Sequence, residues 1–266
     1  MKLAERQSQI ESNGYCLLNG VFSAEECAQL AADLQQSLTV ADPKIVQRRG
    51  DVIYGARDLL RVFPPAAHLA RREPLLGLLR QALGESYGLV RGLFFDKPEG
   101  AGWSLPWDRD LTIAVKDNKL PSRAFSHPTF KAGIPHVEAP SELLAEMLTL
   151  RIHLDDVTEA NGPLRVAPGS HRLAAGANTV DGDGQVRTQE IICDAAGDVL
   201  VMRPLLLHSS AGVEDAEALQ SAGDTKDAQS YSGIDAWSTW SLRRIANCVM
   251  DMAGAISLVR LVLRHS

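Results

Sequence analysis

Residues 148–172 read LTLRIHLDDVTEANGPLRVAPGSHR and contain the clearest strand signal of the chain. Over 148–155, apolar residues alternate with polar ones, which is the period of a strand with two unlike faces. Asn161-Gly162 and Pro168-Gly169 then mark turns. A strand followed closely by turns predicts a β-rich domain around this segment.

Segments on both sides extend this prediction. Residues 89–95, 111–115 and 199–207 have the apolar or alternating character of strands. Ser23 and Glu26 form a capping box before a helix, and a second helix is predicted from Pro74 to about Ala82. The stretch 117–140 is rich in proline and glycine and predicts a long loop, typical of a lid. This order predicts a mainly β protein with flanking helices, built as a double-stranded β-helix (jelly roll, cupin-like) with N-terminal helices.

The composition changes after Ser210. Residues 211–236 are small and polar, which predicts a flexible linker. Apolar residues then recur at helical spacing between 242 and 259, which predicts an atypical helical tail over 237–266. We therefore expect a jelly-roll domain over 1–210, the linker 211–236 and the tail 237–266.

Composition excludes several classes of partner. The chain has 266 residues, 45% of them hydrophobic, which is enough for one sizeable core. Its net charge of −6 and pI near 5.7 predict no nucleic-acid partner. Its 4 cysteines form no CxxC pair, and no run reaches the roughly 18 apolar residues of a membrane span. These features predict a cytoplasmic protein without a membrane partner, and they leave the oligomeric state unknown.

Two segments about a hundred residues apart predict a metal site: PWDRD at 106–110 and GDVLVMRPLLLH at 197–208. A non-haem iron site of the oxygenase type uses two imidazoles and one carboxylate on one face of the ion. His208 and Asp110 fit that requirement, and the position two residues before Asp110 is Asp108. Asp110 also suits a turn, and His208 also suits a buried histidine bonded to a carbonyl.

These segments, with GYCLLNGVFSAEECAQL at 14–30, LFFDK at 93–97, LTIAVK at 111–116 and the segment 148–172 quoted above, resemble the phytanoyl-CoA dioxygenase family in order and spacing. The resemblance implies a jelly roll that binds Fe(II) and 2-oxoglutarate and oxidises an unactivated carbon of a small-molecule substrate. It implies metal ligands at Asp108, Asp110 and His208. The family's segment would read PWHQD, so Asp108 stands where a histidine is expected.

A second departure concerns the cosubstrate. The resemblance implies a basic residue, usually arginine, roughly ten to a dozen positions after His208, to pair with the 5-carboxylate of 2-oxoglutarate. Residues 211–218 are acidic instead, so the candidate cofactor-binding residues are Lys97, Lys116 and Arg151. The later Arg243 and Arg244 would serve only if the tail folds back over the barrel. The family's closing strand is missing from its usual place. Either the tail helix takes over its role, or the tail comes from a truncated or frame-shifted gene.

Three further residues are candidates for substrate contact: Trp107, His136 and His153. Trp107 adjoins the predicted ligands, and His136 lies in the predicted lid. His153 shares with Arg151 a polar face that lines the pocket if the strand belongs to a barrel. Two functions follow: an Fe(II)/2-oxoglutarate-dependent dioxygenase acting on an unknown small organic substrate, or an impaired or inactive family member retained for ligand binding or interaction.

Overall fold

The computed structural model describes residues 2–97, 104–118, 122, 124–173, 186 and 188–210, and the backbone of 255–262. Its strands form a seven-stranded sheet of order β1-β12-β9-β14-β4-β3-β2 and a four-stranded sheet of order β11-β10-β13-β5. Every strand pair in both sheets is antiparallel. Two such sheets make the jelly roll that the sequence predicts.

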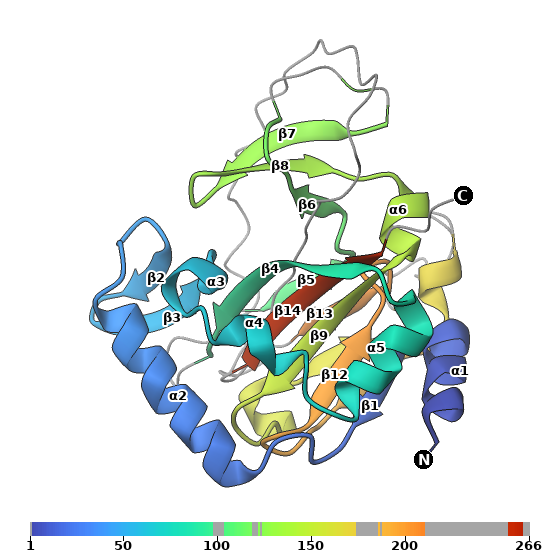
Figure 1. Cartoon of the computed structure of the whole chain (residues 1–266), viewed down its shortest axis with the longest axis horizontal. Helices are drawn as coiled ribbons and strands as arrows, with labels where there is room; N and C mark the ends of the chain where they lie inside the picture. Colours follow the sequence, from blue (N-terminus) through green and yellow to red (C-terminus); the bar gives the residue numbers. More distant parts are fainter. Residues whose placement is uncertain are drawn as a thin grey trace.

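The seven-stranded sheet takes strands from the whole length of the chain (Figure 1). Its members are β1 (Tyr15–Leu18), β2 (Val46–Arg49), β3 (Val52–Ala56), β4 (Tyr87–Phe95), β9 (Met147–His153), β12 (Val199–Met202) and β14 (Ala255–Val262). The four-stranded sheet consists of β5 (Leu105–Asp108), β10 (Leu164–Val166), β11 (Glu190–Ile192) and β13 (His208–Ser210).

Helices flank the larger sheet. They are α1 (Leu3–Asn13), α2 (Ala24–Thr39), α3 (Leu59–Val62), α4 (Ala66–Leu69), α5 (Leu75–Leu83) and α6 (Ser141–Ala145), with short 3-10 turns at Glu159–Asn161 and Ser170–Arg172. The predicted capping box is confirmed, because the Glu26 N–H donates to the Ser23 hydroxyl and the Ser23 N–H donates to the Glu26 carboxylate. The second predicted helix is α5.

One face of β9 builds the core beneath these helices. Leu148, Leu150 and Ile152 belong to the same apolar cluster as Leu34 of α2 and Leu78 of α5, and all five are fully buried or nearly so. Each such leucine contributes roughly 1.5–3 kcal/mol through burial. Since strand side chains alternate, the polar residues of β9 point the other way, toward the four-stranded sheet.

The predicted long loop over 117–140 is wrong over residues 126–138, which form two strands and the turn between them. Residues Ser126–Lys131 form β7 and Ile134–Glu138 form β8, and with β6 (Thr112–Ala114) they make a separate three-stranded sheet of order β6-β8-β7. Figure 1 shows this sheet above the larger sheet, and its Ile113 and Val137 share a buried apolar cluster with Leu93 of β4 and Met147 of β9. Its hairpin turns at Ala132 and Gly133, whose φ angles are 53° and 77°. Two left-handed residues in succession are the geometry of a tight hairpin turn.

The predicted helical tail is wrong over the part of it that the structure describes. Residues Ala255–Val262 form β14, hydrogen-bonded between β4 and β9. By periodicity alone, a short apolar run such as AISLVRLV suits either a helix or a strand. It forms a strand because the backbone groups of two neighbouring strands are available to hydrogen-bond with it. A closing strand is therefore present. The predicted linker 211–236, residues 237–254 and both Arg243 and Arg244 lie outside the described residues.

No helix in the described portion of the chain is both long enough and apolar enough to cross a membrane.

Candidate functional site

His208 opens strand β13 in the interior between the two sheets. Its cross-strand partner on β5 is Asp108, and only 1% of its surface is exposed. Asp110 follows β5 and is held by its N–H, which donates to the Pro204 carbonyl at 2.9 Å. The result is that Oδ1 of Asp110 lies 3.6 Å from Nε2 of His208. Two of the three predicted ligands therefore meet.

The His208 ring is fixed in one orientation. Its Nδ1 lies 2.8 Å from the Leu206 carbonyl, which only accepts, so Nδ1 carries the hydrogen. Nε2 then presents its lone pair, and it has no hydrogen-bond partner among the described residues. Burial lowers the pKa of His208, which favours the neutral ring. A neutral imidazole anchored through Nδ1 and offering Nε2 is the form in which histidine binds metal ions.

Asp108 departs from the predicted ligand set. Although it stands opposite His208, it is exposed, and its Oδ1 accepts the Arg109 N–H at 2.8 Å. Within the described residues, no group of three or more His, Cys, Asp or Glu side chains is arranged to hold a metal ion. His208 and Asp110 thus fit a metal through their donor atoms, and a third ligand requires Asp108 to turn inward or an atom from elsewhere.

The end of β5 is secured by contacts that the motif did not reveal. The Arg109 guanidinium donates to the Leu173 carbonyl at 3.1 Å and to the Ser170 carbonyl at 3.0 Å. Ser170 in turn accepts the Leu207 N–H through its hydroxyl at 2.8 Å. The PGSHR segment therefore ties the strand carrying Asp108 to the residue preceding His208, which gives it a positioning role.

Lys97 reaches the same interior from the opposite sheet. It follows β4, is buried, and donates from Nζ to the Ser210 hydroxyl at 3.0 Å. Ser210 lies two residues after His208 on β13, so both side chains share a face of that strand. Sequence reasoning named Lys97 and missed Ser210. A buried ammonium and a hydroxyl beside a histidine offer hydrogen bonds to an anionic oxygen.

Arg151 and His153 occupy the inward face of β9, as predicted from its alternation. Both are buried, and the positive charge of Arg151 contributes to lowering the pKa of both His153 and His208, after burial. His153 Nε2 lies 2.9 Å from Oδ2 of Asp194, a residue that sequence reasoning missed. Because Asp194 lies in the connection between β11 and β12, no local pattern in the sequence links it to His153.

Lys116 and His136 lie elsewhere, in or beside the three-stranded sheet. Lys116 is exposed after β6. His136 sits within β8 and is fully enclosed, with Nδ1 donating to the Ile134 carbonyl at 2.8 Å and Nε2 accepting from the Arg91 guanidinium. Burial, then the charge of Arg91, lowers the pKa of His136 to about 3. It is therefore not in a flexible lid, and both its ring nitrogens are engaged by protein.

Trp107 is half-buried and packs against a small apolar cluster made by Ala167, Val186 and Leu207. Leu207 immediately precedes His208, so Trp107 supports the strand that carries the histidine.

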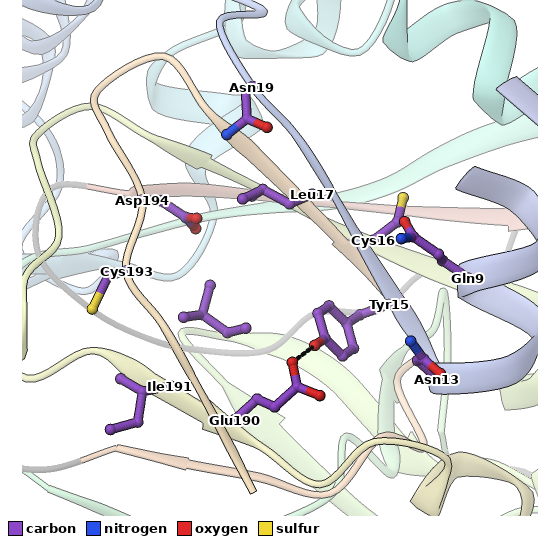
Figure 2. Close-up of a pocket in the computed structure, with 11 residues that line it drawn as sticks. Gln9, Asn13, Tyr15, Cys16, Leu17, Asn19, Glu190, Ile191, Cys193 and Asp194 are labelled. Atoms are coloured by element: carbon purple, nitrogen blue, oxygen red, sulfur yellow. Dashed lines mark hydrogen bonds between the residues drawn. The ribbon is translucent and has the colours of Figure 1, made fainter. Parts of the chain in front are cut away.

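A pocket of about 390 Å³ opens between α1, β1 and the β11 region (Figure 2). Tyr15 and Glu190 meet across it through a hydrogen bond from the phenol to the carboxylate. Burial, then that bond, raises the pKa of Tyr15. Asp194 also lines the pocket, so this surface hollow adjoins the His153 pair rather than His208.

Known proteins resemble the chain in sequence and in fold. It is 29% identical over 177 residues to an ectoine dioxygenase of Bordetella parapertussis, covering 64% of this chain and 49% of that one. It is 28% identical over 184 residues to a probable alpha-ketoglutarate-dependent hypophosphite dioxygenase of Stutzerimonas stutzeri, covering 64% and 54%. The chain thus spans about half the length of these curated relatives.

Solved structures share the fold. EctD from S. alaskensis with bound Fe aligns with a TM-score of 0.63 at 18% identity, over 97% of this chain and 76% of that one. The same protein with 2-oxoglutarate and 5-hydroxyectoine aligns with a TM-score of 0.61 at 18% identity, over the same shares of both chains. The family model for phytanoyl-CoA dioxygenase (PhyH) matches residues 10–214, and the chain belongs to that family.

Proposed function

We propose that this protein is an Fe(II)- and 2-oxoglutarate-dependent dioxygenase that oxidises a small organic substrate. Family membership supports the reaction class, as do the names of the relatives, which include an ectoine dioxygenase and a hypophosphite dioxygenase. A fold neighbour holds Fe in one structure and 2-oxoglutarate in another. The identity of the substrate is left open.

The observation that carries the proposal is the pairing of His208 with Asp110. A buried Nε2 lone pair facing a carboxylate oxygen at 3.6 Å is suited to share one metal ion. His208 and Asp110 would hold Fe(II), with Asp108 as the third group once its carboxylate turns inward. Bound Fe(II) with 2-oxoglutarate supplies the oxidising power for attack on a substrate carbon.

Lys97 is the best candidate for the cosubstrate's distal carboxylate. It is a buried cation joined to Ser210, and Ser210 follows His208 by two residues on one strand face. Arg151, the buried cation on the facing strand β9, is a second candidate for an anionic group. Lys116 is exposed beside the three-stranded sheet, which favours Lys97 over it. His153 and Trp107 stay as proposed substrate contacts.

A spectroscopic and product assay tests the proposal. Protein kept free of oxygen and given Fe(II) with 2-oxoglutarate should develop the metal-to-ligand charge-transfer absorption of the chelated cosubstrate, and should release succinate when oxygen is admitted. His208→Ala is the matched negative control, since it removes the nitrogen ligand. If folded wild-type protein shows neither the absorption band nor succinate release, the proposal that it is an enzyme is refuted.

A second function, ligand binding without turnover, is favoured by Asp108. A carboxylate replaces the expected imidazole there, and two carboxylates make the site harder, which shifts its preference toward Mn or Mg. A barrel kept for binding would be stabilised by ligands without consuming 2-oxoglutarate. Thermal shifts by small hydrophobic acids in folded protein that releases no succinate would support this alternative.

We also propose that the protein works in the cytoplasm on a small molecule. The three cysteines that the structure describes, Cys16, Cys27 and Cys193, are free, which suits a reducing compartment. Fractionation of the native host with antibody detection would test this location.

A further inference from the structure

His153 is a second buried histidine in the barrel interior, with a free acceptor atom. It ends β9, and 1% of its surface is exposed. Its Nε2 lies 2.9 Å from Oδ2 of Asp194. Because an ionised carboxylate only accepts hydrogen bonds, Nε2 carries the hydrogen and Nδ1 carries the lone pair. Among the described residues, neither ring nitrogen of His153 and neither carboxylate oxygen of Asp194 has a partner in full hydrogen-bond geometry, so the Nε2–Oδ2 approach is a close ionic contact and Nδ1 has no donor.

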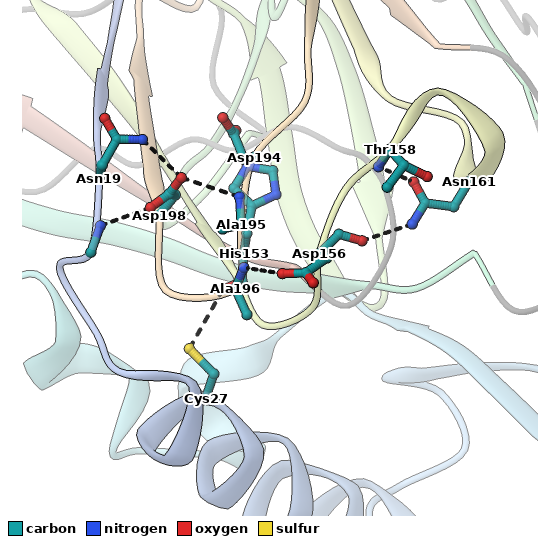
Figure 3. A network of polar contacts seen from close by, with 11 residues as sticks. Asn19, Cys27, His153, Asp156, Thr158, Asn161, Asp194, Ala195, Ala196 and Asp198 are labelled. Atoms are coloured by element: carbon teal, nitrogen blue, oxygen red, sulfur yellow. Dashed lines mark hydrogen bonds and ion pairs between the residues drawn. The ribbon is translucent and has the colours of Figure 1, made fainter.

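The connection that carries Asp194 is fixed by other contacts (Figure 3). Asp198 accepts the Gly20 N–H at 2.7 Å, and Asp156 accepts the Ala196 N–H at 2.9 Å. These bonds tie the part of the connection that follows Asp194 to neighbouring elements. The Asp194 carbonyl accepts the Val157 N–H at 2.7 Å, which fixes its backbone, and its side chain lies against His153.

The surroundings of His153 limit what its lone pair can bind. Burial lowers the pKa of His153, the bond to Asp194 raises it, and the charge of Arg151 lowers it again. A neutral ring is thereby favoured, so Nδ1 stays an acceptor. An ammonium donor would be repelled by Arg151, whereas a neutral O–H or N–H group would not. A buried acceptor left without any donor costs roughly 1–3 kcal/mol.

We propose that His153, oriented by Asp194, is a specificity-determining acceptor, and that the substrate presents a neutral hydroxyl or amide N–H to its Nδ1. This inference rests on the proposed function, because it takes the barrel interior to be the place where the substrate binds. Asp194 acts through His153 and is a positioning residue.

The first measurement reads the tautomer directly. Histidine side-chain nitrogens are isotope-labelled in the full chain without metal, and His153→Asn identifies the His153 signals by their loss. We expect nitrogen chemical shifts of a neutral ring protonated at Nε2. Asp194→Asn removes the charge that favours this form and should shift the population toward Nδ1–H. Asp156→Asn is the matched control: it loosens the same connection without touching His153 and should leave the tautomer unchanged.

The second measurement tests the acceptor with a matched pair of small probes. N-methylacetamide carries one N–H donor, and N,N-dimethylacetamide has nearly the same shape without it. Titrated into wild-type protein, the first should shift the His153 Nδ1 signal with an apparent affinity about fivefold or more above the second, the ratio expected for one net hydrogen bond. This comparison does not depend on whether Asp194→Asn folds.

Each result decides the proposal. The proposal is supported if the ring is protonated at Nε2, if Asp194→Asn but not Asp156→Asn changes the tautomer, and if N-methylacetamide gives the stronger response. A ring protonated at Nδ1 or at both nitrogens, equal effects of Asp194→Asn and Asp156→Asn, or equal or absent responses to the two amides would overturn it. Because no metal or 2-oxoglutarate is present, these outcomes are separate from the charge-transfer and succinate assays of the proposed function.

Discussion

The barrel interior and the three-stranded sheet each hold a buried histidine, and the two are built alike. In His208 and in His136, Nδ1 lies 2.8 Å from the carbonyl two residues earlier. They differ in what Nε2 faces. His136 meets the Arg91 guanidinium, whereas His208 meets the carboxylate of Asp110. The same local geometry thus gives an arginine-bound ring in one region and a ring whose Nε2 faces a carboxylate in the other.

The same contrast applies to the two candidate lysines. Lys97 is buried between the sheets and bonded to Ser210, while Lys116 is exposed at the end of β6. In both comparisons the two residues are of the same type. Their chemistry differs because different structural elements surround them.

The largest effect is expected at the histidines. His208→Gln removes the imidazole that lies beside Asp110 and should weaken Fe(II) binding by more than about hundredfold, beyond what loss of a supporting contact costs. His136→Gln should leave Fe(II) affinity within about twofold, because both ring nitrogens of His136 are engaged by Arg91 and Ile134. Competition with a chromophoric chelator under anaerobic conditions measures both. Equal losses in the two variants would contradict the assignment of His208.

The lysines should differ by somewhat less. Lys97→Met removes a buried charged donor, so the affinity for 2-oxoglutarate should fall by roughly 10- to 150-fold, the equivalent of about 1.5–3 kcal/mol for a hydrogen bond to a charged group. Fe(II) affinity should be retained. Lys116→Met, the exposed counterpart, should change neither. Calorimetric titration of 2-oxoglutarate gives the comparison, and an unchanged affinity in Lys97→Met would move the carboxylate contact to Arg151 or elsewhere.

A third, smaller effect is expected from repairing the ligand set. Asp108→His replaces an exposed carboxylate opposite His208 by a neutral imidazole, which suits Fe(II) better and removes a negative charge near Asp110. We expect Fe(II) to bind about tenfold tighter, within the range that changes around a metal site produce. Asp108→Asn, which loses the charge without gaining a nitrogen ligand, is the control. Weaker or equal binding in Asp108→His would show that position 108 lies outside the metal site.

The sequence was sufficient for the barrel but not for its additions. Alternation in β9 predicted which face carries Arg151 and His153, because a strand with one apolar face leaves its period in the residues themselves. Strand β6 was predicted, but the β7–β8 hairpin was missed because it turns on Ala132-Gly133, and alanine at the first left-handed position gives a weaker signal than asparagine. The strand β14 was missed because its apolar run fits two periods, and only the neighbours β4 and β9 distinguish them.

The candidate site divides in the same way. His208, Asp110 and Lys97 were predicted from motifs that keep each of them next to a strand end. Ser210, Asp194 and Arg91 were not, because each acts through a residue distant in the chain: Lys97, His153 and His136 respectively. Spacing in the sequence carries no information about such pairs. The inward or outward direction of Asp108 was equally beyond reach, since it depends on the bond between its carboxylate and the Arg109 N–H.

The smallest expected effect is a pH dependence of stability at His136. Its pKa is about 3 in the folded protein against an ordinary value of 6.5, so the unfolded chain takes up a proton in that interval and the folded chain does not. The stability contributed by the neutral ring is therefore complete above pH 6.5 and is lost as pH falls toward 3. One proton changes the free energy of unfolding by at most about 1.4 kcal/mol per pH unit.

His136→Gln removes this titration while an amide can still accept from Arg91. Between pH 6.5 and 3, wild-type stability should fall more steeply than that of the variant, and the two curves should run parallel above pH 6.5. Urea unfolding of metal-free protein across this range measures the difference. The other buried histidines, among them His153 and His208, titrate alike in both proteins and cancel, so parallel curves throughout would mean that His136 does not stay neutral beside Arg91. That result would also remove the contrast with His208, because the Arg91 guanidinium would then not be bound to a neutral His136 Nε2.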